Sequence, residues 1–291
     1  MELNHQEVTT APQAAASVVM LRDTKEGLEV LLLKRHAASN AFGGAYVFPG
    51  GKLDQADGEL DMATHLDQDV EALHAALREP GLSPLQAAGL HVAALREAFE
   101  ECGLLLAHGA SERLAELAAM RVTQGLTFNR LLADLSLRLD TTNLVPWSRW
   151  ITPRVPSLTT RRFDTRFFLA SVEDGMSVSH DDREAVDSVW LQPRTALERY
   201  WNGELTFAPP QIMSLAHLAR HERVQDVLDE ARAAGPALIQ PHSCEIDGLR
   251  VVCYPGDERH PVPSHALPGP TRLVFRNRRF EPFDGFEGFF G

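Results

Sequence analysis

Three glutamates stand close together in one short segment, at positions 97, 100 and 101. An apolar run at residues 92–95 precedes them, so the segment predicts a helix, and spacings of three and four residues share one helical face. Three carboxylates on one face repel one another, so we expect such a helix to gain a compensating cation. Oxygen ligands without convergent His or Cys favour Mg²⁺ or Mn²⁺. A solvated acidic face is the alternative interpretation, and most glutamate clusters are of that kind.

A glycine-rich turn lies upstream, where residues 48–54 read Phe-Pro-Gly-Gly-Lys-Leu-Asp. Residues 46–48 predict a short strand that leads into this turn. Glycines allow close backbone approach, and the turn leaves a carbonyl free to bind a metal. We therefore expect the Gly50 carbonyl to complete a metal site with Glu97, Glu100 and Glu101.

Together the turn and the helix resemble the signature of the Nudix hydrolases, which runs Gly, five residues, Glu, seven residues, then Arg-Glu-apolar-x-Glu-Glu-x-Gly-apolar. Its second half matches residues 96–104, with Ala98 at the apolar position. Counting from Gly51 gives Asp57 where the family usually has Glu, and roughly thirty extra residues then precede Arg96. A signature split at this point is similar to that of the Nudix subgroup that includes the peroxisomal coenzyme A diphosphatases. The resemblance covers roughly residues 17–220.

This resemblance implies an α/β fold, the Nudix α/β/α sandwich with a mixed central sheet, and hydrolysis of a phosphoanhydride in a nucleoside diphosphate derivative. It implies that Glu97 orients and deprotonates the attacking water or binds a second ion, and that Arg96 holds Glu97 by a charge-assisted hydrogen bond. Asp57 is a candidate to complete that brace. A further metal ligand or base is expected from the loop at 179–184, where Glu184 is the best placed; Asp181, Asp182 and Asp187 compete with it.

The subgroup points to coenzyme A or acyl-coenzyme A as the substrate, cut to 3′,5′-ADP and (acyl-)phosphopantetheine. The phosphates need cationic contacts, for which Lys34, Arg35, Arg161 and Arg162 are candidates. Pairing of the arginines in 149–166 with local acids such as Asp164 is the alternative. ADP-sugars, dinucleotides and NADH stay open as substrates, and so does a non-catalytic Nudix module that binds a ligand.

The composition of the 291 residues is that of a globular protein, 44% hydrophobic and 23% charged. The net charge of −12 argues against general binding to nucleic acid or to a membrane surface. Apolar runs fall short of the roughly 18 residues that a membrane span needs. Cys102, Cys244 and Cys253 lack the paired spacing of a metal site, so we expect reduced thiols and a cytoplasmic location.

Three regions follow from the patterns along the chain. Residues 1–13 are expected to be disordered, and 14–235 to form the Nudix domain with a helical insertion at about 58–90. Within the insertion, residues 62–79 predict one helix. Residues 236–291 are expected to form a β extension that packs on the main domain or makes a homodimer contact, with a hairpin on an Asp-Gly turn at 247–248.

Two histidines in the predicted helix 206–221 have a spacing that could bind zinc. His217 and His221 are four residues apart. The sequence shows neither the intervening Glu of a zinc-protease motif nor an obvious third ligand, so it does not predict a zinc site.

Overall fold

A mixed β-sheet forms the centre of the computed structural model, which describes residues 4, 7–37, 43–155, 161–176, 178–179 and 185–291. In order across the sheet, β3-β2-β1-β6-β5-β8 are neighbours, β4 also pairs with β1, and β7 with β2. The β1–β6 and β5–β8 pairs are parallel and the others antiparallel. The strands are β1 (Gln13–Thr24), β2 (Gly27–Arg35), β3 (Tyr46–Val47), β4 (Gly50–Lys52), β5 (Val145–Ile151), β6 (Phe163–Ser171), β7 (Ala185–Leu191) and β8 (Ala237–Ile239).

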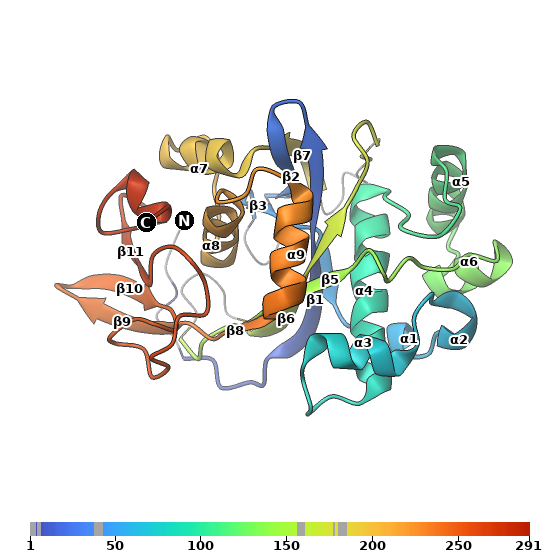
Figure 1. Cartoon of the computed structure of the whole chain (residues 1–291), viewed down its shortest axis with the longest axis horizontal. Helices are drawn as coiled ribbons and strands as arrows, with labels where there is room; N and C mark the ends of the chain where they lie inside the picture. The colour runs from blue at the N-terminus through green and yellow to red at the C-terminus, as the bar shows by residue number, and fades with distance from the viewer. Residues whose placement is uncertain (1–3, 5–6, 38–42, 156–160, 177, 180–184) are drawn as a thin grey trace.

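Helices cover both faces of this sheet (Figure 1). They are α1 (Gln55–Gly58), α2 (Met62–His65), α3 (Val70–Leu77), α4 (Pro84–Cys102), α5 (Glu112–Thr123), α6 (Phe128–Asp134), α7 (Pro193–Trp201), α8 (Pro209–Leu218) and α9 (Val224–Ala234). Side chains of β1 alternate between two cores: Val18 and Met20 pack with α4, whereas Val19 and Leu21 pack with α8 and α9. The predicted α/β/α sandwich is confirmed. Within the described residues, no helix is both long and apolar enough to cross a membrane.

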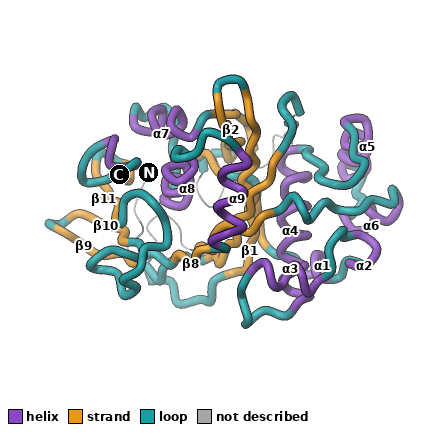
Figure 2. The backbone as a smooth tube through the Cα atoms, viewed as in Figure 1, coloured by secondary structure: helices purple, strands orange, loops and turns teal. Residues whose placement is uncertain are grey.

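A second sheet follows α9, as the strand colouring of Figure 2 shows. It orders its strands β12-β11-β10-β9, with β9 (His242–Ile246), β10 (Leu249–Cys253), β11 (Arg272–Arg276) and β12 (Arg279–Glu281), and the short 3₁₀ helix η1 (Phe286–Phe289) comes last. Asp247 and Gly248 both have positive φ, 51° and 75°, as a two-residue hairpin turn requires. Val252, Leu273 and Phe280 belong to the core that α8 and α9 share, so this extension packs on the main domain.

The insertion differs from the expected single helix over 62–79. The structure has α2 and α3 instead, because Leu66 is extended and Asp69 starts a new helix by accepting a hydrogen bond from the amide of Ala72. The last part of the expected insertion, from Pro84 to about residue 90, already belongs to α4. In the segment expected to be disordered, Val8 donates a hydrogen bond to the carbonyl of Arg154, and Gln13 begins β1.

A charge cluster fastens the insertion to the sheet. Glu79, which follows α3, accepts hydrogen bonds at 2.9 and 2.6 Å from the Arg166 guanidinium and lies 2.8 Å from Arg149. Arg149 and Arg166 are cross-strand neighbours on β5 and β6, and both also contact Asp164. The Arg166 side chain is only 4% exposed and that of Glu79 11%. Two acids thus compensate the buried Arg166 and the partly buried Arg149. For these two arginines the alternative of pairing with acids is the one that the structure contains.

Replacing Glu79 is therefore expected to destabilise the fold. Glu79→Gln should lower the free energy of unfolding by about 2–3 kcal/mol, because Arg166 keeps its charge in a buried place and loses its bidentate partner. Denaturant unfolding measures this. The control Asp134→Asn removes the exposed Arg130–Asp134 pair and should cost less than about 1 kcal/mol. Equal effects of the two variants would contradict the assignment.

Candidate active site

The helix α4 carries the three glutamates near its C-terminal end. Ser83 caps its N-terminus in a reciprocal pair with Gln86, and Pro84 occupies the first turn. Gly103 ends it in the left-handed conformation with φ 70°. Leu95 and Phe99 anchor the helix in the core, so the opposite face, with the glutamates, turns toward β4. The helix predicted from the glutamate spacing is confirmed.

The glycine turn packs against this helix and against β1. The Pro49 carbonyl accepts hydrogen bonds from the amide of Val18, at 2.8 Å, and from the hydroxyl of Ser17, at 2.9 Å. A Cβ on Gly50 would lie 2.5 Å from the Ala16 carbonyl oxygen. A Cβ on Gly51 would overlap the Glu97 carboxylate, whose Oε2 would be 2.7 Å away. Glycine is required at position 50 because backbone atoms occupy the space of a side chain, whereas a side chain at position 51 would displace the Glu97 carboxylate.

Arg96 binds carboxylates from both halves of the split signature. Its Nε and Nη2 donate to the two oxygens of Asp57 at 2.8 and 3.1 Å, across 39 residues of sequence. Its Nη1 donates to Glu97 at 2.8 Å and to Glu100 at 2.9 Å. Burial opposes the charged guanidinium, but the hydrogen bond to Asp57 and the charges of Glu97, Asp57 and Glu100 outweigh it and raise the pKa of Arg96. The candidate brace from Asp57 is present.

Protein donors contact all three glutamates. Glu101, which is 7% exposed, accepts a hydrogen bond of 2.8 Å from the amide of Gly50. Burial raises the pKa of Glu100, and the positive charge of Arg96 only partly opposes this shift. Glu97, Glu100 and Glu101 would hold a cation here through the carboxylate oxygens that Gly50 and Arg96 contact. The possible ligand atoms are carboxylate oxygens, and they lie beside the backbone of Gly50 and Gly51. Such ligands fit a hard divalent ion.

The residues predicted to bind substrate lie at two places on the sheet. Lys34 is paired with Tyr46 in the β2–β3 ladder, next to the strand that leads into the glycine turn, and the buried Nε of Arg35 has no hydrogen-bond partner among the described atoms. Arg162 donates to the carbonyls of Thr152 and Thr10, whereas Arg161 is exposed. All four residues stay predictions as substrate contacts, and the Lys34 ammonium lies over the Tyr46 ring.

Glu184 and its competitors Asp181 and Asp182 lie outside the described residues. Asp187 is described, and it accepts a hydrogen bond of 3.0 Å from the hydroxyl of Tyr46.

Sequence reasoning missed the role of Glu79, since no motif relates an insertion loop to strands that follow 70 residues later. Counting along the family signature did find Asp57.

Comparison with known proteins agrees with this geometry. The family model of the NUDT19 Nudix domain matches residues 6–218, so the chain belongs to the Nudix hydrolases and is a pyrophosphohydrolase of that family. A crystal structure of a Nudix hydrolase from Alicyclobacillus acidocaldarius superposes with a TM-score of 0.59 at 25% identity, over 76% of this chain and 97% of that one.

Curated relatives indicate which group of Nudix hydrolases this chain belongs to. The chain is 32% identical over 243 residues to the acyl-coenzyme A diphosphatase NUDT19 of Homo sapiens, covering 69% of this chain and 63% of that protein. It is 27% identical over 277 residues to the Xenopus laevis protein of the same name, covering 80% and 71%. The predicted family and its coenzyme A diphosphatase group are therefore confirmed.

The space beside Gly51 gives a test of the site that leaves its charges unchanged. Gly51→Ala places a methyl group against the Glu97 carboxylate and should lower kcat about 10–100-fold, because small misplacements of reacting groups are costly. Steady-state kinetics on a nucleoside diphosphate substrate measures this. Gly81→Ala is the control, since a Cβ there meets nothing within 4 Å. A Gly51→Ala enzyme with unchanged kcat would refute the close approach.

The Asp57 brace gives a second test. Asp57→Asn keeps the size of the side chain but removes the charge that faces Arg96, and should lower the free energy of unfolding by about 1–3 kcal/mol. It should also reduce kcat more than it raises KM, because Arg96, which holds Glu97, loses its charged partner while substrate contacts persist. Unfolding curves and kinetics on one preparation separate the two effects. A stability loss with normal kcat would show that the brace is only structural.

Proposed function

We propose that this enzyme hydrolyses the diphosphate of coenzyme A or acyl-coenzyme A in a reaction that depends on Mg²⁺ or Mn²⁺. The products are 3′,5′-ADP and (acyl-)phosphopantetheine. The observation that carries the proposal is the packing of Gly50 and Gly51 against Glu101 and Glu97 in a chain whose relatives are named acyl-coenzyme A diphosphatases. The homodimer and the cytoplasmic location stay predictions.

When bound, a divalent ion neutralises the anhydride oxygens and lowers the pKa of a coordinated water. Glu97, Glu100, Glu101 and the Gly50 carbonyl would hold it, with Glu184 as the further ligand or base. Arg96 fixes Glu97 through Oε1, and this orients the carboxylate that accepts the proton of the attacking water. Lys34 and Arg35, at the end of β2, contact the phosphates of the substrate.

A substrate panel tests the choice of substrate. Coenzyme A, acyl-coenzyme A, ADP-ribose, NADH and a dinucleotide are incubated with and without Mg²⁺, and the released 3′,5′-ADP or AMP is quantified. We expect the highest kcat/KM for the coenzyme A class and no turnover after chelation. A preference for ADP-ribose, NADH or the dinucleotide would favour another Nudix hydrolase activity. Metal-independent binding without turnover would favour a ligand-binding module.

Glu101→Gln tests the metal role within the same panel. The amide keeps an oxygen for the Gly50 hydrogen bond but loses the charge, so the melting temperature should change little. Turnover should fall by at least about 100-fold, beyond the loss usual for residues outside the ligand set. Glu116→Gln, on the exposed side of α5, is the matched control. Full turnover of Glu101→Gln at saturating Mg²⁺ would exclude Glu101 as a ligand.

A further inference from the structure

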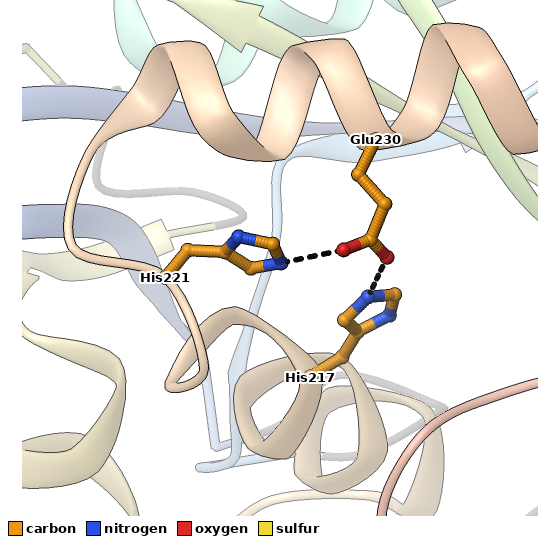
Figure 3. A group of neighbouring side chains, drawn as sticks. All are labelled: His217, His221 and Glu230. Carbon is orange, nitrogen blue, oxygen red and sulfur yellow. Dashed lines mark hydrogen bonds and ion pairs between the residues drawn. The ribbon is translucent and has the colours of Figure 1, made fainter.

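A second cluster of possible metal ligands lies on the other face of the sheet, at the end of α8 (Figure 3). His217 stands in the last turn of α8, His221 in the connection that follows, and Glu230 on α9. The Nε2 atoms of the two histidines lie 2.7 and 3.0 Å from different oxygens of the Glu230 carboxylate. One ligand atom from each residue lies within 4.8 Å of the others. Glu230 is the third ligand that the sequence did not reveal.

We propose that His217, His221 and Glu230 bind one transition-metal ion, with Zn²⁺ the preferred species, and that the ion fastens α8 to α9. Two imidazole nitrogens and one carboxylate oxygen are a donor set that suits Zn²⁺, whereas Mg²⁺ prefers oxygen alone. A water molecule can complete four-coordination from the solvent side, because the Glu230 side chain is 47% exposed.

The surroundings of the histidines favour a cation. His217 is buried and its Nε2 faces the Glu230 carboxylate at 2.7 Å, so the ring and the carboxylate are placed to share one ion. His217 also lies at the helix C-terminus, where the peptide dipoles attract positive charge.

This cluster is separate from the active site. Helix α4, with the glutamates, packs on the face of β1 that carries Val18 and Met20, whereas α8 and α9 pack on the face with Val19 and Leu21. The ion therefore contributes to stability rather than to hydrolysis, and the inference does not depend on the proposed substrate.

Another cluster, formed by Asp67, His108 and Asp140, serves as a comparison. It offers a single imidazole, and Asp67 already accepts hydrogen bonds from Thr141 and Thr142. Those bonds outweigh burial and lower the pKa of Asp67 to about 2. Asp67 thus organises the turn at 140–143, and the cluster gives a control of similar composition.

The test is a Zn²⁺ titration by calorimetry of the full chain, stripped of metals by a chelator and held in excess Mg²⁺ to occupy the carboxylate site. Visible absorption of bound Co²⁺ gives a second readout, since tetrahedral nitrogen and oxygen ligation differs from octahedral oxygen ligation. The variants are His221→Ala and Glu230→Gln, with His108→Ala as the control. The melting temperature of each metal-free variant shows that it folds, and the less buried His221 and Glu230 are chosen over His217 for that reason.

We expect the wild type to bind one Zn²⁺ and to melt at a higher temperature when it is bound. Affinity should fall at least about 100-fold in His221→Ala and in Glu230→Gln, more than the loss usual for residues outside the ligand set, and stay unchanged in His108→Ala. Absence of Zn²⁺ binding in the wild type would overturn the proposal and leave a hydrogen-bonded triad. Equal affinity in His221→Ala, or loss of binding in His108→Ala, would also overturn it.

Discussion

The guanidinium of Arg96 is the interaction on which the active site depends. Without it, Asp57, Glu97 and Glu100 would place three negative charges in a partly buried space, and like charges at such distances strongly disfavour one another. Arg96 contacts all three at 2.8–3.1 Å and also donates to the Lys52 carbonyl at 3.1 Å. One cation thus permits acids to accumulate on α4 and ties that helix to the glycine turn.

The same arrangement holds the carboxylates close together through protein donors. Arg96 and the Gly50 amide hold the carboxylates through hydrogen bonds to charged groups, which are stronger than neutral ones but exchangeable.

Sequence reasoning predicted features that depend on residues close together in the sequence. It failed for features that depend on contacts between residues far apart in the sequence. Glutamates at fixed helical spacing, a glycine turn and an Asp-Gly hairpin each follow from chemistry within a few residues, and the structure contains all three elements. The break between α2 and α3 was missed although the Asp69 cap is local. The hydrogen bond from the Thr141 amide to Asp67 could not be predicted, because it joins residues 74 positions apart. Glu230 was missed for the same reason, since its approach to His217 depends on how α9 returns over the sheet.

The split signature shows how an enzyme of this kind can accept an insertion. Helix α1, where the insertion begins, lies against α4, where it ends: a Cβ on Gly89 would be 3.5 Å from the Gly58 Cα. The ion pair between Asp57 and Arg96 joins the two ends of the insertion. The inserted segment therefore begins and ends at almost the same place in the fold. Loop closure over longer chains costs little additional entropy, so the length of α2 and α3 is largely uncoupled from the position of Glu97. Glu79 anchors the inserted segment to β5 and β6, so the stability of that segment does not depend on the proposed catalytic groups.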